Sequence, residues 1–138
     1  MALVIDEAGR KLCKMACDAA ELAYVKYSNF HVGAALITTE SIYSAANVEN
    51  ASYGLTLCAE RAVIARAVTA GDRNLVRLAV ACIDASPEAG INETMPCGAC
   101  RQWFIEFAPD LEVLIWSPSE IRGFSARELL YVPFMLGT

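Results

Sequence analysis

The pattern of hydrophobic and polar positions predicts helices that alternate with short strands. Over residues 6–26 apolar residues recur three and four positions apart, which is typical of an amphipathic helix. Residues 32–39 and 42–48 favour β-structure and are separated by a polar break, so they predict a hairpin. Beyond it we expect a helix, a buried strand, a helix, a strand and a short helix, over residues 57–70, 75–84, 97–107, 112–116 and 126–130. This order predicts an α/β fold in which helices pack on a mixed sheet.

Composition favours a single folded domain over residues 1–138. The chain is 56% hydrophobic and 20% charged, with a mean hydropathy of +0.38. These values exclude a disordered chain, which would be poor in apolar residues and rich in charge. Because a small domain leaves much of its surface exposed, the apolar composition also predicts that some surface is buried between identical subunits.

The sequence predicts neither a membrane segment nor a polynucleotide partner. It contains no run of about 18 uninterrupted apolar residues, and its first residues lack the basic and apolar regions of a signal peptide. We therefore expect a cytoplasmic protein. The net charge is −5, with the 11 basic residues scattered along the chain, whereas nucleic-acid binding requires a positive face. A small neutral ligand is compatible with this charge.

Three of the six cysteines predict a metal site. Cys97 and Cys100 lie three positions apart at the start of a predicted helix, so both sulfurs are expected on one face. Cys58 opens another predicted helix, and helix N-termini favour the thiolate form that a metal needs. Three thiolate ligands leave the fourth tetrahedral position of Zn²⁺ for water, which is typical of a catalytic site.

The other cysteines are predicted to be small core residues, since free cysteine is commonly buried. They are Cys13, Cys17 and Cys82. A closed structural site with a fourth protein ligand is the alternative to a catalytic one. For His31, the single histidine, we expect an ordinary polar contact rather than metal ligation.

Glu60 lies two residues after Cys58, where its carboxylate would exchange a proton with a water molecule on the metal. The alternative is a first-turn glutamate that only interacts with the helix dipole. Beside a three-thiolate site we favour proton transfer. Arg61 would offset part of the net negative charge of zinc with three thiolates.

These cysteine segments belong to a longer series of motifs. They are Cys58-Ala-Glu-Arg61 and Pro96-Cys-Gly-Ala-Cys-Arg-Gln102, preceded by Tyr27-Ser-Asn-Phe30-His-Val-Gly-Ala-Ala-Leu36 and Asn47-Val-Glu49-Asn-Ala51-Ser-Tyr53, and followed by Glu128-Leu-Leu-Tyr-Val-Pro-Phe134. In this order they resemble the short, homotetrameric, zinc-dependent cytidine deaminases, from about Cys13 to Phe134. The resemblance implies a three-layer α/β fold, a mixed five-stranded sheet with helices on both faces, and one Zn²⁺ per subunit on Cys58, Cys97 and Cys100.

The resemblance also implies a nucleoside site. Glu60 would be the proton shuttle, Phe30 would line the pyrimidine pocket, and the backbone at Ala59 would hold the pyrimidine carbonyl. Asn47 and Glu49, which are expected near the end of a strand with both side chains on one side, would bind the ribose 3′-hydroxyl.

Three further residues would reach the site of a neighbouring subunit in a homotetramer with shared active sites. They are Ala51, Tyr53 and Phe134. The C-terminal segment departs from the family pattern, because Tyr131 stands where proline is common, and so does the loop before Pro96, which is longer than in many members.

The predicted reaction is the hydrolytic deamination of cytidine and 2′-deoxycytidine to uridine and 2′-deoxyuridine, with release of ammonia, in pyrimidine salvage. Two alternatives are a blasticidin-S-type aminohydrolase and a non-enzymatic, zinc-stabilised binding protein. The segment from Asn47 to Ala51 argues against the first, since it serves an unmodified ribose in the family. Glu60 argues against the second, since structural zinc needs no proton shuttle.

Overall fold

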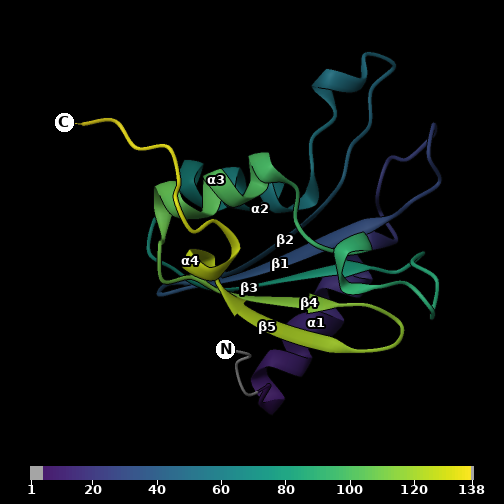
Figure 1. Ribbon diagram of the computed structural model, residues 1–138, viewed down its shortest axis with the longest axis horizontal. Coiled ribbons are helices and arrows are strands. Elements are labelled where there is room, and N and C mark those ends of the chain that lie inside the picture. The colour runs from purple at the N-terminus through teal and green to yellow at the C-terminus, as the bar shows by residue number, and fades with distance from the viewer. Residues whose placement is uncertain (1–4, 138) are drawn as a thin grey trace.

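The computed structural model describes residues 5–137, and in this part of the chain five strands form one mixed sheet (Figure 1). The strands are β1 (Val32–Thr38), β2 (Ile42–Ala46), β3 (Leu75–Cys82), β4 (Glu112–Trp116) and β5 (Ile121–Ser125). Their spatial order is β2-β1-β3-β4-β5, and β3 and β4 are parallel while the other neighbours are antiparallel.

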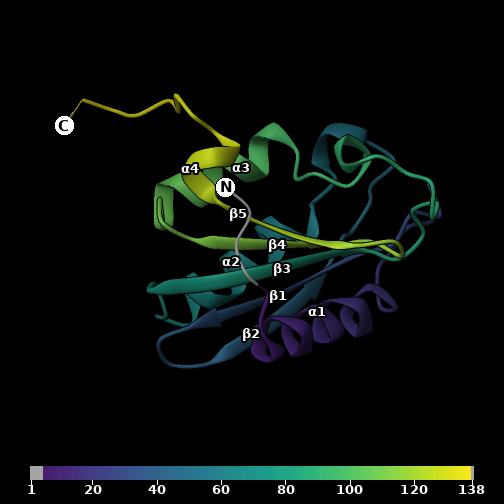
Figure 2. The ribbon, with the colours of Figure 1, turned by 60° about the horizontal axis from the view of Figure 1, so that its bottom comes forward.

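Helices cover both faces of this sheet. They are α1 (Glu7–Ala20), α2 (Ala59–Thr69), α3 (Gly98–Phe107) and α4 (Ala126–Leu129). Figure 2 shows α1 on one side of the sheet and α3 and α4 on the other, and α2 shares a buried cluster with α3. The predicted three-layer α/β fold is thus confirmed. Within residues 5–137 no helix is both long enough and apolar enough to cross a bilayer.

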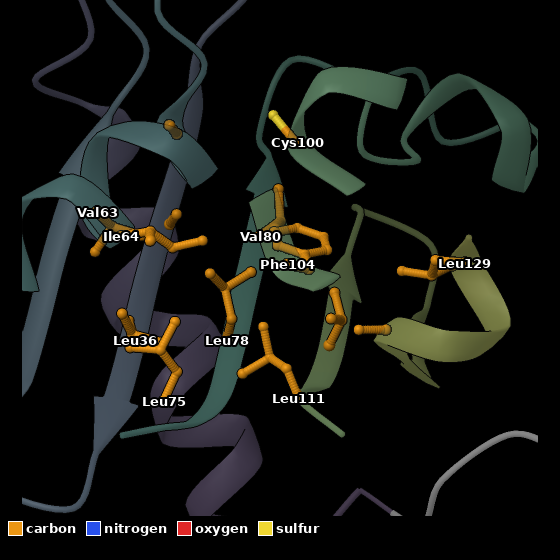
Figure 3. Close-up of a cluster of buried hydrophobic side chains, with 14 of the residues drawn as sticks. Leu36, Val63, Ile64, Leu75, Leu78, Val80, Cys100, Phe104, Leu111 and Leu129 are labelled. Atoms are coloured by element: carbon orange, nitrogen blue, oxygen red, sulfur yellow. The ribbon is translucent and has the colours of Figure 1, made fainter. Parts of the chain in front are cut away.

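The larger core cluster fills the space between the sheet and α2, α3 and α4 (Figure 3). Leu36 and Leu78 from the strands meet Ile64 and Phe104 from the helices, and all four are fully buried. Cys100 lies at one end of this cluster. The hydrophobic core therefore fixes the start of α3 relative to the sheet.

A smaller cluster lies beneath α1, which buries Leu12, Cys13 and Ala16 against the other face of the sheet. Gly33 of β1 permits this close packing, because a Cβ atom at that position would stand 1.9 Å from the carbonyl oxygen of Ala16. Cys17 packs at the edge of the same cluster and is partly exposed, whereas Cys13 is buried as predicted.

Two of the predicted elements differ from those observed, and one observed strand was not predicted. The first helix ends at Ala20 rather than near residue 26, because the backbone of Tyr24 pairs instead with Asn47 and Glu49. The strand expected over 42–48 ends at Ala46, so Asn47 and Glu49 lie in the irregular segment beyond it. The sequence pattern did not predict β5. Its residues Ile-Arg-Gly-Phe-Ser lack a clear strand pattern of apolar positions, although in the structure they pair along the whole of β4.

Strand register gathers several distant segments at one edge of the sheet. Val32 at the start of β1 lies opposite Cys82 at the end of β3, and Gly33 lies opposite Ala46 at the end of β2. The chain enters α2 and α3 close to the same edge, where one hollow is lined by residues from all of these segments. This edge is where the candidate site forms.

Candidate functional site

The three cysteines predicted to bind metal lie together. The sulfur of Cys97 is 3.9 Å from that of Cys58 and 3.5 Å from that of Cys100, and all three sulfurs lie within 4.8 Å of one another. Among residues 5–137 no fourth histidine, cysteine or carboxylate joins them. His31 instead contacts Asp84, so the closed structural site is not formed by these residues.

Helix starts position this cluster. Cys58 and Cys97 are the N-cap residues of α2 and α3, with extended backbone, and neither side chain caps its helix. Their sulfurs are therefore available for other contacts, close to the N–H groups of the first helical turns. Cys100 lies one turn into α3, with its side chain at the end of the buried core.

The donor set and its spacing fit zinc. Tetrahedral Zn²⁺ binds thiolate at about 2.3 Å, which places two sulfur ligands about 3.8 Å apart. The observed separations of 3.9 and 3.5 Å agree with this value. Three soft sulfur ligands select zinc over hard cations such as Mg²⁺ or Ca²⁺, which prefer oxygen.

Charge at the cluster favours a thiolate. Hydrogen bonding with Cys100, reinforced by Arg61, lowers the pKa of Cys58 to about 5. The pKa of Cys100 is raised by the same hydrogen bond and by burial. Arg61 places Nη2 3.2 Å from the sulfur of Cys58, which is the arrangement expected of a charge-balancing residue.

Glu60 lines the same hollow as Cys58 and Cys97, and only 5% of the residue is exposed. Burial raises the pKa of its carboxyl group to about 7. A carboxyl group with a pKa near neutrality exchanges protons readily in both directions. The first-turn position alone does not explain why this glutamate is buried in a cavity, since dipole-stabilising glutamates are usually exposed.

The hollow has a volume of about 180 Å³. Four of the predicted residues besides the cysteines line it, namely Phe30, Asn47, Ala59 and Glu60. Residues that were not predicted as site residues also line it, namely Val32, Thr56, Val80, Cys82, Glu93, Thr94 and Met95. Cys82 is buried as expected for a core residue. Of the unpredicted set, Thr94 and Met95 carried a usable signal, because they directly precede Pro96 and Cys97.

Asn47 holds the wall of this hollow as well as lining it. Its Oδ1 accepts a hydrogen bond from the N–H of Val32 at 2.9 Å, and its Nδ2 donates to the carbonyl of Phe30 at 3.0 Å. The residue is 8% exposed. An amide has a second N–H and a second lone pair, so these two bonds leave capacity for a ligand.

Glu49 lies beside a second hollow of about 290 Å³, which Tyr27, Ser28, Tyr53 and Thr56 also line. Thr56 borders both hollows. The Glu49 carboxylate accepts hydrogen bonds from the backbone N–H groups of Tyr27 and Ser28 and from the Ser28 hydroxyl. The hydroxyl bond, more than the backbone bonds, lowers the pKa of Glu49, so a charged acceptor is present near the site.

The three residues expected to serve a neighbouring subunit are exposed in the single chain. Ala51 and Tyr53 lie at the surface, with the Tyr53 ring against that of Tyr27 at a centroid separation of 6.2 Å. Phe134 is 71% exposed, and its backbone bonds the side chain of Gln102. None of the three lines the hollow that contains the cysteines.

Comparison with known proteins agrees with this geometry. Residues 6–115 match the family described as the cytidine and deoxycytidylate deaminase zinc-binding region. The chain belongs to this family. It is 43% identical to a cytidine deaminase from Halalkalibacterium halodurans over 122 residues, which cover 86% of this chain and 88% of the relative.

The chain is also similar to a solved cytidine deaminase structure and to a blasticidin-S deaminase. The crystal structure of cytidine deaminase from Burkholderia pseudomallei superposes with a TM-score of 0.81 at 43% identity, covering 91% of this chain and 98% of that one. A blasticidin-S deaminase from Bacillus cereus is 30% identical over 91% of both chains. Zinc is thus the cofactor supported both by the family and by the three-sulfur cluster.

Proposed function

We propose that this protein is a zinc-dependent hydrolase that converts cytidine and 2′-deoxycytidine to uridine and 2′-deoxyuridine, with release of ammonia, in pyrimidine salvage. The observation that carries the proposal is a buried glutamate, Glu60, in one cavity with a three-thiol cluster. A zinc site that only stabilised the fold would not require an adjacent cavity with a protonatable carboxylate.

In this proposal Cys58, Cys97 and Cys100 hold one Zn²⁺ per subunit, and Arg61 balances part of the thiolate charge. The bound metal supplies Lewis acidity that makes a water molecule nucleophilic near neutral pH. Because Cys58, Cys97 and Glu60 line one hollow, a metal held by the three cysteines would lie close to the Glu60 carboxyl group and to a bound substrate.

Glu60 moves the protons. Its carboxylate accepts a proton from the attacking water and delivers it to ring N3 of the pyrimidine, so that the water oxygen can bond to C4. It then carries the proton of the new C4 hydroxyl group to the amino nitrogen, so that the C–N bond breaks, ammonia leaves and the C4 carbonyl of the product forms. Burial raises the pKa of Glu60 to about 7, which suits a group that both accepts and releases a proton near neutral pH.

The nucleoside would be held by the remaining cavity residues. Phe30 offers an aromatic wall for the pyrimidine, and the N–H of Ala59, in the first turn of α2, lacks an intrahelical acceptor and suits the pyrimidine carbonyl. The free capacity of the Asn47 amide and the charged Glu49 carboxylate suit the donor and acceptor sides of the ribose 3′-hydroxyl.

The charges around the site favour a nucleoside over a nucleotide. Among the described residues, neither the cysteine-containing hollow nor the Glu49 hollow is lined by a lysine, arginine or histidine. Both carry carboxylates, Glu60 and Glu93 in the first and Glu49 in the second. A phosphate group would therefore meet like charge without a basic partner.

A homotetramer with shared active sites is part of the proposal. Its support is apolar surface that a single chain leaves uncovered, including Tyr53, which is 76% exposed, and Tyr131, which is 90% exposed. Beyond Phe134, whose backbone bonds the side chain of Gln102 in α3, the C-terminal segment extends away from the helices (Figure 1). In the assembly Ala51, Tyr53 and Phe134 would reach a neighbouring site, and light scattering should report four chains per particle.

A cytoplasmic location and one catalytic domain over residues 1–138 complete the proposal. All six cysteines lie in the described part of the chain without a disulfide, and reduced cysteines are typical of the cytoplasm. Neither a membrane nor a polymeric nucleic acid is proposed as a partner.

The test is an ultraviolet absorbance assay with cytidine, 2′-deoxycytidine, cytosine and blasticidin S in parallel. We expect turnover of the two nucleosides and very little turnover of free cytosine, which lacks the ribose. Turnover of blasticidin S alone would favour the aminohydrolase, and turnover of none of the four by the zinc-loaded protein would favour the non-enzymatic alternative.

A further inference from the structure

Two walls of the cysteine-containing hollow come from segments that are far apart in the sequence. Phe30 and Val32 belong to the segment that leads into β1, whereas Glu93, Thr94 and Met95 belong to the loop between β3 and α3. In the described part of the chain, the side-chain hydrogen bonds that join residues 27–32 to residues 83–97 both end on Asp84.

The Asp84 side chain binds His31, which lies between the two wall residues Phe30 and Val32. Its Oδ2 accepts a hydrogen bond from the backbone N–H of His31 at 2.7 Å and lies 2.6 Å from Nδ1 of the His31 ring. The first of these bonds, with burial opposing it, lowers the pKa of Asp84, so the acceptor is charged at neutral pH. Both side chains are about one-third exposed, and neither lines the hollow.

The peptide unit between Phe30 and His31 is consequently held at both ends. Its carbonyl oxygen accepts from Asn47 Nδ2 at 3.0 Å, and its N–H donates to Asp84 at 2.7 Å. Because a peptide unit is planar, fixing both groups fixes its plane. The Phe30 N–H, which donates to the Ser28 hydroxyl at 3.0 Å, holds the preceding peptide plane, and the two planes together set the direction in which the Phe30 side chain leaves the backbone.

The preceding residue shows why this segment needs such support. Asn29 has a φ of +57° and is the single non-glycine residue with positive φ among residues 5–137. Left-handed backbone is unfavourable for residues with a side chain, although asparagine tolerates it better than most. Loss of the contacts at His31 would leave the turn at Asn29 with fewer restraints and let Phe30 move away from the hollow.

We propose that Asp84 is a positioning residue for substrate binding, which fixes the Phe30 wall through His31. The proposal rests on the proposed nucleoside deaminase function, since it assigns Asp84 to the placement of the pyrimidine. Asp84 lines neither hollow, and within residues 5–137 its side-chain hydrogen bonds are to His31 alone. Its loss should therefore weaken binding of the nucleoside and leave the proton transfers at Glu60 intact.

The test compares Asp84→Ala, Asp84→Asn and the control Glu88→Gln in the zinc-loaded protein. Glu88 is a carboxylate of the same loop that is bonded by Ser86 and lies outside the hollow. We expect Asp84→Ala to raise KM for cytidine about five-fold or more, with kcat within about two-fold of wild type, because an acceptor bond is lost. Asp84→Asn keeps an acceptor oxygen and should restore most of the affinity, and Glu88→Gln should leave KM unchanged.

Two additional measurements separate positioning from a general loss of structure. Hydrogen exchange at the amides of residues 28–33 should speed up in Asp84→Ala, while exchange in α2 and α3 stays the same. His31→Ala should raise KM less than Asp84→Ala does, and combining the two should add little, because both act through one contact.

The proposal is overturned if KM for Asp84→Ala stays within about 1.5-fold of wild type, or if Asp84→Asn is as impaired as Asp84→Ala. It is also overturned if exchange over residues 28–33 does not change. Failure of the proposed function would look different: the wild-type protein and Glu88→Gln would not deaminate cytidine, while the exchange measurement would still report on the contact.

Discussion

Asn47 has two roles in the structure, and replacing it with alanine should affect both. The side chain bridges the Phe30 carbonyl and the Val32 N–H with bonds of 3.0 and 2.9 Å. Asn47→Ala removes both bonds, while the backbone bond from the Asn47 N–H to the Val32 carbonyl is retained. A role confined to ribose binding would cost affinity alone, whereas the bridge predicts an additional loss of stability.

The size of the expected stability loss follows from the burial of the Asn47 side chain. Asn47 is 8% exposed, so the two backbone groups that lose their partners are poorly compensated by water. Each lost bond costs about 1–1.5 kcal/mol, which gives a total of about 2–3 kcal/mol in the free energy of unfolding. For a domain of this length the melting temperature should fall by about 10 °C.

Chemical and thermal unfolding of the zinc-saturated protein measure this loss. Asn50→Ala is the matched control, because the Asn50 side chain accepts only a local bond from Ser52 at an exposed position, and it should cost less than about 0.5 kcal/mol. Asn47→Ala should also lower kcat/KM for cytidine at unchanged zinc content. If Asn47→Ala unfolded with the same free energy as Asn50→Ala, the bridging role would be refuted.

Three other perturbations test the fold and the site. Gly33→Ala should prevent normal packing of α1, seen as a large loss of folded protein in circular dichroism, because its Cβ would stand 1.9 Å from the Ala16 carbonyl oxygen; a melting temperature equal to wild type would contradict the packing. Removing zinc with a chelator should abolish turnover and lower stability reversibly, since metal at a hundred times its dissociation constant contributes about 2.7 kcal/mol; unchanged unfolding after metal loss would contradict this. The hydrogen bond from the Ser28 hydroxyl lowers the pKa of Glu49 below its ordinary 4.5, so the carboxylate stabilises the fold above that pH and loses this contribution as pH falls toward its folded-state pKa. Urea unfolding between pH 7 and pH 3 should therefore show a smaller acid-induced loss for Glu49→Gln than for wild type, and identical pH profiles would contradict it.

The cysteine cluster could be predicted from the sequence because short-range features of the chain place its residues. Cys58 and Cys97 each begin a helix, and Cys100 follows by one turn, so propensity and spacing alone place three sulfurs at helix starts. Glu60 is likewise placed by its position in the sequence, two residues after Cys58. The order of helices and strands along the chain was sufficient to predict the α/β class.

What the sequence did not predict depends on strand register and on long-range hydrogen bonds. Val32 and Cys82 meet in the hollow because β1 and β3 pair in a particular register, which no local pattern specifies. The contact of Asp84 with His31 spans 53 positions and joins two irregular segments. The proposed role of Phe134 involves a neighbouring subunit, so neither the pattern nor the single chain determines its place.

The most direct test of the proposed chemistry is the turnover of Glu60→Gln at verified zinc content. Glutamine keeps the size and polarity of Glu60 in a nearly fully buried position but cannot carry the proton. Glu106→Gln, which alters an exposed residue of α3, is the control and should match wild type.

Steady-state deamination of cytidine should be measured for wild type, Glu60→Gln and Glu106→Gln, with zinc determined in the same samples. We expect one zinc per chain in all three proteins and a fall in kcat of at least about 10²-fold in Glu60→Gln alone, because general acid–base catalysis contributes about 10²–10⁴-fold. Wild-type turnover by fully zinc-loaded Glu60→Gln would contradict the proposed mechanism.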